Sequence, residues 1–295
     1  MNAVMIIMQA LNGLTIAAIY ILLASGLTIV LGLQRIVNIA HGFFYMIGAY
    51  ISVSVVAKMN LSFWFSLPVA FLCAALLGAV LEILGIRSLL RWKREHHHAM
   101  ILTLGIALGG GEVVKMIWGA IPQLATVPAS FQGVLVAGPI IYPKYWLFVV
   151  VLTIFIMAAI WVFFNMTDLG IMVRAVAADN DTAQALGTRA PMLNTLVFAF
   201  GTGLAGVAGV LAAPILGVDP NMGMELLLIL FVVIILGGLG SLMGAMISAV
   251  LIGLVMSFGT AFISGTIAKI LVFATMIVIL IISPSGLIAQ GKEID

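Results

Sequence analysis

Charged residues are scarce in this sequence. They make up 7% of its 295 residues, whereas 64% are hydrophobic. A soluble domain has about 25% charged and about 45–50% apolar residues, so these charges cannot cover the surface of a soluble protein of this length. No charged residue occurs from position 1 to 34 or from 226 to 268. Each run exceeds the ~20 apolar residues that cross a bilayer, and the composition therefore predicts a polytopic membrane protein.

Further absences exclude whole classes of function. The single cysteine, Cys73, lies in an apolar run, which excludes a disulfide framework or a cysteine metal site. No G-x-x-x-x-G-K-S/T phosphate loop occurs, so we expect no ATP-binding domain in this chain. A net charge of +2 is too small to follow a nucleic-acid backbone, so we expect no nucleic-acid partner. No Ser/His/Asp or Cys/His set points to catalysis, and we expect neither an enzyme nor a cofactor or metal site.

The apolar runs, punctuated by glycine, proline and charge, predict an all-α transmembrane helical bundle. Barrel strands would alternate over ~10 residues, and because no such runs occur the segments are assigned to helices. We expect about eight or nine membrane segments, some of them broken or re-entrant, in one domain over residues 1–295. The expected segments are roughly 5–33, 37–57, 62–86, 100–119, 145–164, 193–213, 225–239, 242–262 and 266–282.

The distribution of lysine and arginine predicts the orientation. Four basic residues lie between the third and fourth segments: Arg87, Arg91, Lys93 and Arg94. Because cytoplasmic loops of membrane proteins are enriched in Lys and Arg, we assign this loop to the cytoplasm. Counting from it puts Arg35, Arg174 and Arg189 on the same side, and Lys58, Lys144 and Lys269 outside. The N-terminus is then outside and the C-terminus in the cytoplasm.

Two long connections separate the segments. Residues 120–144 contain four prolines and are expected to form an ordered exterior loop. Residues 165–192 carry many of the charges and are expected in the cytoplasm. Thr167 and Asp168 are good N-caps for one amphipathic helix that runs through Leu186, and Gly187 suits the position after its end.

Two glycine-rich breaks interrupt the apolar runs. Residues 225–262 are too long for one membrane helix, and Gly237–Ser241 supply either a re-entrant break or a tight turn. Sliding 41–52 onto 237–248 aligns this break with the one at 38–42. Gapped segments at corresponding places in two halves point to the pathway of a transporter; alternatively, such glycines only let helices pack closely. The residues assigned to the pathway are Asn38, His41, Gly42, Gly237, Gly238, Gly240 and Ser241.

Several motifs together resemble one known family. They are GLTIVLG at 26–32, VNIAHG at 37–42, YMIGAY at 45–50, AGVAGVL at 205–211 and LGGLGS at 236–241. Arg174 and Asp179, which lead into Ala183 and Gly187, belong to the same pattern. In this order, and over nearly the whole chain, the sequence resembles the membrane permease subunits of branched-chain amino acid ABC transporters.

The resemblance implies a role and a set of partners. It implies an importer permease in the bacterial cytoplasmic (inner) membrane, which forms the pathway for branched-chain or related small amino acids. A paralogous permease would complete the pore, two cytoplasmic ATPase subunits would drive it, and an external binding protein would deliver the substrate. Relatives also carry urea and short amides, but Phe43 and Phe44 stand where the urea branch has an acidic residue. That difference favours apolar amino acids.

The resemblance also assigns the cytoplasmic loop to ATPase coupling. DTAQALG at 181–187 resembles the acidic-Ala-Ala-x-x-x-Gly motif of importer permeases, although Thr182 departs from it and the downstream I-x-L-P element is absent. An ordinary solvated loop helix is the alternative. The residues assigned to coupling are Arg174, Asp179, Asp181, Ala183 and Gly187.

Four polar residues in the apolar segments remain to be explained. Asn38 and His41, at the head of the second segment near the cytoplasmic side, would either contact substrate or cap a helix break. Glu112 and Lys115 lie three residues apart on one helix face, so we expect an intramembrane ion pair, with contact to a zwitterionic amino acid as the alternative. An ion-coupled secondary transporter would need acidic residues at mid-membrane, where Glu112 is the only candidate.

Overall fold

The chain folds into a bundle of helices with one small hairpin. The computed structural model describes residues 3–91 and 96–288. Its helices are α1 (Ala3–Gln34), α2 (His41–Val53), α3 (Phe63–Val80), α4 (Arg87–Arg91), α5 (His96–Trp118), α6 (Lys144–Met166), α7 (Asp168–Ala178), α8 (Asn180–Ala185), α9 (Ala190–Leu216), α10 (Met222–Gly237), α11 (Leu242–Phe262) and α12 (Gly265–Ile282). Two π-helical segments, Ser54–Lys58 and Leu81–Ile86, continue α2 and α3, and Ala129–Phe131 form a 3-10 turn. Of the predicted basic cluster, Lys93 and Arg94 lie outside the described residues.

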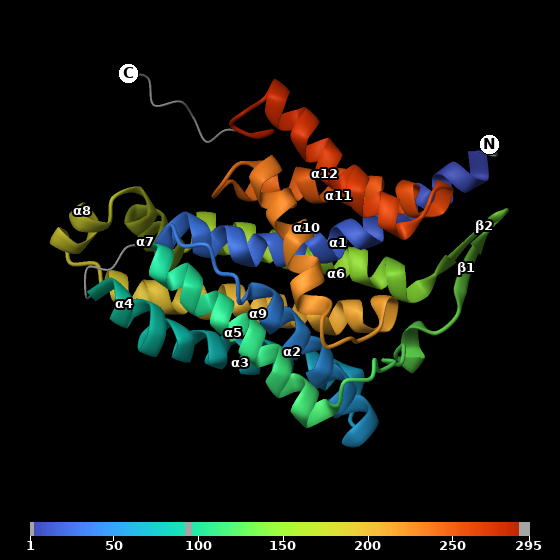
Figure 1. Cartoon of the computed structure of the whole chain (residues 1–295), viewed down its shortest axis with the longest axis horizontal. Coiled ribbons are helices and arrows are strands. Elements are labelled where there is room, and N and C mark those ends of the chain that lie inside the picture. The colour runs from blue at the N-terminus through green and yellow to red at the C-terminus, as the bar shows by residue number, and fades with distance from the viewer. Residues whose placement is uncertain (1–2, 92–95, 289–295) are drawn as a thin grey trace.

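The long helices α1 and α9 form the centre of the bundle. In Figure 1 they run along the long axis of the molecule, and other helices surround them. Over their most apolar stretches 72% of α1 and 83% of α9 is buried, against 11% for both α5 and α12. The helices α5 and α12 are therefore on the outside of the chain, where a membrane or another subunit can meet them.

Glycines let the central helices approach until their backbones touch. A Cβ atom added at Gly26 of α1 would lie 2.5 Å from the carbonyl oxygen of Gly201 in α9. The same construction at Gly48 of α2 places a Cβ 2.0 Å from the Gly206 oxygen, and at Gly209 of α9 it places one 2.0 Å from the Tyr45 oxygen. Small residues at helix contacts are typical of packing in membranes, where no hydrophobic effect drives helices together.

The predicted all-α, polytopic bundle is confirmed, and each of the nine expected segments corresponds to a helix. Among the described residues, seven helices are long and apolar enough to cross a membrane: α1, α3 with its extension, α5, α6, α9, α11 and α12. The two remaining segments contain the short helices α2, with 13 residues, and α10, with 16. At ~1.5 Å per residue these helices are shorter than a bilayer core of ~30 Å. The short helices are the ones beside the two predicted breaks.

The loop at 120–144 contains a hairpin that the sequence analysis did not predict. Strand β1 (Val134–Ala137) pairs antiparallel with β2 (Ile140–Pro143), with Val134 opposite Pro143. Gly138, at φ +62°, begins the two-residue turn between them. Tyr142 of β2 donates a hydrogen bond of 3.0 Å to the Leu11 carbonyl of α1, so the hairpin is attached to the bundle. The sequence analysis missed the hairpin because its apolar runs are short and because four prolines lie in and near them.

The loop at 165–192 contains two helices, and the prediction of one helix from 168 through 186 was wrong. Thr167 caps α7 as expected, because its side chain accepts a hydrogen bond from the Gly170 N–H. Asp179 then takes an extended conformation, and its carboxylate accepts hydrogen bonds from the N–H groups of Asp181 and Thr182 at 3.0 and 3.1 Å. A residue that caps a new helix cannot also continue the old one. Gly187 follows α8 with φ +94°, as predicted.

Candidate functional site

Helix α2 begins deep inside the bundle. Its first residue, His41, is fully buried, and its Nε2 lies 3.1 Å from the carbonyl oxygen of Leu23. Leu23 is about three turns before the end of α1 at Gln34. Residues 35–40 therefore lead from the end of α1 into the middle of the molecule (Figure 1), starting with Arg35 at φ +54°. His41 thus lies much farther from the end of the bundle than the sequence analysis expected.

The polar residues before α2 are buried but only partly satisfied. Thr103 of α5 accepts a hydrogen bond from the Ile39 N–H at 3.2 Å, and His41 contacts the Leu23 carbonyl. Asn38 is completely buried, and within the described part of the chain neither atom of its amide has a hydrogen-bond partner. The His41 Nδ1 has none there either. His41 thus meets the carbonyl of a residue within the continuous helix α1, and both residues keep hydrogen-bonding capacity that the described residues do not use.

The short helices α2 and α10 cross backbone to backbone. A Cβ at Gly42 would lie 2.1 Å from the Gly223 carbonyl oxygen, and a Cβ at Gly223 would lie 2.4 Å from the Gly42 oxygen. The sequence analysis assigned Gly42 to the pathway, with close helix packing as the alternative, and it missed Gly223 because it began that segment at residue 225. The preceding Pro220 and Asn221 are a helix-start signal that could have placed the boundary correctly.

A cavity of about 160 Å³ lies beside this crossing, between α2, α5 and α10. Phe43, Met46 and Leu227 are among the apolar residues that line it, together with Glu112 and Lys115. The Lys115 Nζ lies 2.7 Å from the Glu112 Oε1, and the two side chains are 31% and 65% exposed. The arrangement combines one positive and one negative charge with an apolar wall.

Glycines in α5 shape the wall of this cavity. Gly110 faces the Phe43 ring, whose atoms would lie as close as 2.4 Å to an added Cβ. At Gly109, one residue earlier, no atom of the described residues outside the neighbouring turns of α5 lies within 4 Å of the corresponding position. The helix α5 remains continuous through both residues, so the glycines allow a neighbour to approach and do not break the helix.

The second predicted break is a tight turn between α10 and α11. Gly238 and Gly240 take φ values of +92° and +85°, which favour glycine. Ser241 then caps α11 by accepting a hydrogen bond of 3.1 Å from the Gly244 N–H. A Cβ at Gly237 would lie 2.5 Å from the Ala245 nitrogen, so α10 and α11 also meet backbone to backbone.

The two sets of predicted pathway residues lie at opposite ends of α10. Gly42 meets the first turn of α10 at Gly223, whereas Gly237–Ser241 follow the last turn. The suggested repeat matched His41 with Gly237, but α2 begins at His41 and α11 begins at Leu242. The helix starts therefore do not coincide, and α10 itself connects the two sets.

The residues assigned to coupling divide into buried and exposed ones. Ala183 is 4% exposed and belongs to an apolar cluster with Val176 and Leu193 of this chain. Asp181 and Leu186 are exposed, and Leu186 is 83% exposed. Hydrogen bonds from the Thr182 hydroxyl and from backbone N–H groups lower the pKa of Asp179, so its carboxylate stays ionised as the cap of α8. The exposed surface of α8 and of the residue that follows it thus includes Asp181 and Leu186.

A second cavity, of about 500 Å³, lies between the coupling loop and the α10–α11 turn. Its lining includes Arg174 and Ala177 of α7, Gly32 of α1 and Gly240 of the turn. The Arg174 guanidinium donates a hydrogen bond to the Phe164 carbonyl at the end of α6. A displacement of α7 would therefore act directly on α6 and α1, which it contacts, and through α1 on α10 and α11.

Comparison with protein families matches residues 9–280 to the family described as the permease component of the branched-chain amino acid transport system. The chain belongs to this family. It is 28% identical to the high-affinity branched-chain amino acid transport system permease protein LivH of Escherichia coli, over 96% of both chains. It is also 36% identical to the LivM permease of the same system in Escherichia coli, over 35% of this chain and 22% of LivM.

A solved structure shows the same type of fold. The complex described as PsaBC from Streptococcus pneumoniae with Fab contains a chain that matches with a TM-score of 0.52, covering 93% of this chain and 91% of that one. The sequences are 13% identical. The likeness concerns the arrangement of helices alone.

Proposed function

We propose that this chain is the permease subunit of an ATP-driven importer and forms, as a single transmembrane domain, part of the pathway for branched-chain or related apolar amino acids. Similarity to LivH over 96% of both chains carries this proposal. Phe43 and its apolar neighbours in the cavity beside α2 agree with an apolar substrate better than with urea or a short amide.

The orientation that we propose from the sequence agrees with which elements and which basic residues lie at each end of the bundle. In Figure 1 the helices α4, α7 and α8 lie at one end, and the N-terminus and the β1–β2 hairpin lie at the other. Arginines gather at the first end, at positions 35, 87, 174 and 189, while Lys144 follows the hairpin directly. The positive-inside rule then assigns the first end to the cytoplasm of a bacterial inner membrane.

Exposed charges on the membrane-length helices support the position of the pathway. Glu112 and Lys115 lie on α5, which is otherwise exposed and apolar. Charged side chains in a membrane face a water-filled cavity or another protein, because contact with lipid tails is unfavourable. We therefore assign this face of α5 to the pathway, opposite a second permease, and we retain Asn38, His41 and Gly42 as its inner lining.

The coupling proposal follows from the geometry of the cytoplasmic end. ATP-driven movement of a partner ATPase would displace α8 and α7, and the contacts of α7 with α1 and of α1 with α10 would pass this displacement to α10. In this scheme Asp181 contacts the ATPase, Ala183 fixes α8 to its own chain, Asp179 begins the helix, and Gly187 turns the chain away. The turn from Gly237 to Ser241 is then the point at which α10 tilts.

Vesicle transport tests the function. Purified chain, reconstituted with its paralogous permease, two ATPases and a binding protein, is expected to take up L-leucine only when ATP is present. Ionophores should not reduce this uptake, and excess urea should not compete with it. Uptake by this chain alone in response to a proton or sodium gradient would instead establish the secondary-transporter alternative.

Leu186 provides a separate test of coupling. Leu186→Glu places a charge on the exposed apolar side chain directly after α8, so we expect it to abolish co-purification with the ATPase through a loss of about 2 kcal/mol or more. Leu186→Met keeps an apolar side chain of similar size and should retain the complex. Both variants should insert into membranes, as measured by the yield of folded chain. Unchanged ATPase association in Leu186→Glu would contradict the docking role of α8.

A further inference from the structure

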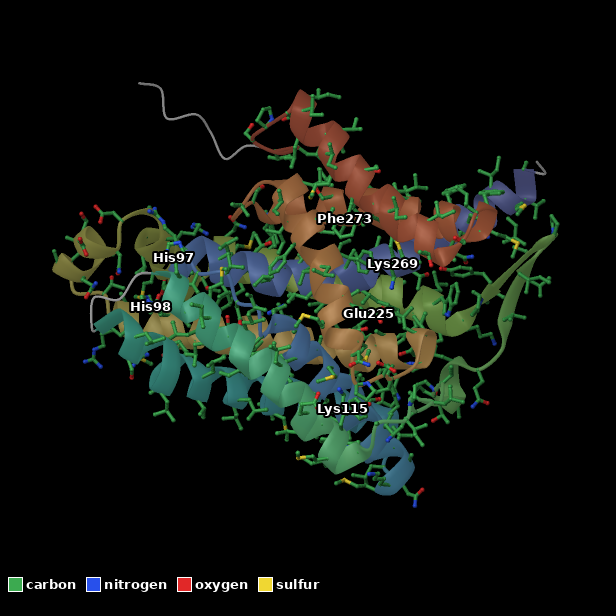
Figure 2. All side chains as sticks on the ribbon, in the orientation of Figure 1. His97, His98, Lys115, Glu225, Lys269 and Phe273 are labelled. Carbon is green, nitrogen blue, oxygen red and sulfur yellow. The ribbon has the colours of Figure 1, made fainter. Side chains whose placement is uncertain are left out.

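A third cavity lies on the other side of the first turn of α10. Its volume is about 270 Å³, and residues of α1, α2, α10, α11 and α12 line it. Figure 2 shows Glu225, on α10, between Lys269 of α12 and Lys115 of α5. Glu225 and Lys269 both line the cavity.

Charges of both signs stand at the mouth of this cavity. The Lys269 Nζ lies 2.9 Å from the Glu225 Oε2, and these side chains are 50% and 65% exposed. Asp219, in the connection between α9 and α10, also lines the cavity. Its carboxylate accepts a hydrogen bond of 2.7 Å from the Asn221 N–H, which fixes its position.

The inner part of the cavity is apolar and aromatic. Ile229 and Met256 line it together with the deeply buried Tyr20 and Tyr45. The cavity therefore has a charged end and an apolar end, as does an amino acid with an apolar side chain.

The ion pair itself can exchange partners with such a ligand. An exposed ion pair contributes little to stability, so separating Lys269 from Glu225 is not strongly unfavourable. A zwitterion supplies a carboxylate to the lysine and an ammonium group to the glutamate at the same time, and both protein charges stay paired. A simple anion or cation pairs with only one of them and leaves the other unpaired.

We propose that this cavity is a binding subsite for zwitterionic α-amino acids with apolar side chains. Lys269 binds the carboxylate, Glu225 with Asp219 binds the ammonium group, and the side chain enters between Ile229 and Met256. The substrate class rests on the proposed function of the chain. If the Lys269–Glu225 pair only held α10 and α12 together, binding of a ligand at this cavity would not depend on the charges of that ligand.

Protection of an introduced cysteine tests the subsite. In a Cys73→Ala background, Met256→Cys places a thiol in the cavity wall, and Thr260→Cys places one on the exposed surface of α11 as a control. The full chain in nanodiscs is treated with a small water-soluble methanethiosulfonate. L-leucine should slow modification of Met256→Cys and leave Thr260→Cys unaffected, whereas 3-methylbutylamine and 4-methylpentanoate, each of which lacks one charge, should protect little.

Charge-removing variants complete the test. Adding Lys269→Gln or Glu225→Gln should raise the L-leucine concentration that gives half protection about tenfold, the effect of one charge-assisted hydrogen bond, while the melting temperature stays close to that of the parent. No protection by L-leucine, equal protection by all three compounds, or protection that both variants leave unchanged would overturn the subsite.

Comparing cysteine protection with vesicle transport tests the subsite and the proposed function independently. ATP-driven L-leucine uptake by the complete transporter without any protection at Met256→Cys contradicts the subsite alone. Protection by L-leucine in a chain that supports no ATP-driven uptake contradicts the importer function alone.

Discussion

Gly42→Ala is expected to reduce ATP-driven L-leucine uptake about ten- to hundredfold. The added methyl carbon would lie 2.1 Å from the Gly223 carbonyl oxygen, and a backbone atom cannot move aside as a flexible side chain can. Overpacking of this kind is unfavourable by about 1–3 kcal/mol. Strain of about 1.4–2.8 kcal/mol, within that range, in one conformation of an alternating cycle changes the balance between conformations ten- to hundredfold. Uptake is measured in vesicles that contain the complete transporter.

Gly109→Ala is the matched control for this substitution. It adds the same methyl group to a helical glycine, in α5, but nothing lies within 4 Å of the new atom. Alanine is favoured over glycine within a helix by about 0.5–1 kcal/mol, so uptake and stability should be unchanged or slightly higher. Gly223→Ala should reproduce the defect from the other side of the contact. Equal losses in Gly42→Ala and Gly109→Ala would show that the α2–α10 crossing has no special role.

Glu82→Ala is expected to destabilise the chain by about 3 kcal/mol, because it removes the buried partner of an ion pair and leaves Arg87, whose side chain is 22% exposed, without its counter-charge. Glu82 is 3% exposed, and its Oε2 accepts hydrogen bonds from Arg87 at 2.9 Å and from the Thr195 hydroxyl at 2.5 Å. Arg87 also donates to the Pro191 carbonyl at 2.6 Å. These bonds attach the end of α3 to the start of α9, directly after the coupling loop. The measurement is the equilibrium unfolding of the purified chain in detergent.

A double-mutant cycle provides the control for Glu82. Arg87→Ala should be similarly destabilising, and the double variant should lose far less than the sum of the two single losses, because the two side chains interact directly. Lys115→Ala breaks an exposed pair and should change stability by less than about 1 kcal/mol. A loss for Glu82→Ala as small as that for Lys115→Ala would contradict the importance of the buried network.

The sequence predicts those features of the fold that depend on local composition. Long uncharged runs predict the membrane helices, and the glycines at 237, 238 and 240 predict a break, which is a turn in the structure, because both signals lie within one segment of the chain. The partner of Gly42 could not be found in this way, since Gly223 lies far along the chain and no local pattern joins them. The depth of His41 depends equally on how residues 35–40 lead into the bundle.

The other features that the sequence analysis missed have three physical reasons: a local hydrogen bond that competes with a helix, segments too short to form a pattern, and a contact between distant parts of the chain. Asp179 lies in a pattern that suits one continuous helix, yet its carboxylate accepts hydrogen bonds from the N–H groups of Asp181 and Thr182 and so begins a new helix. Strands β1 and β2 are each four residues long, too short to stand out between prolines. The exposed pair of Glu225 and Lys269 joins two helices that are separate in sequence, so their spacing gives no signal.

The glycine contacts of α2 with α9 and α10 also have a mechanical consequence. Helices usually interlock through side chains that fit into hollows of the neighbour, and sliding one past another requires those side chains to change rotamer. At Gly42, Gly48 and Gly209 there are no such side chains, and one smooth backbone lies against another. Small shear displacements along these surfaces need no repacking. The central contacts of the bundle thus hold the helices close together and still allow them to slide along one another.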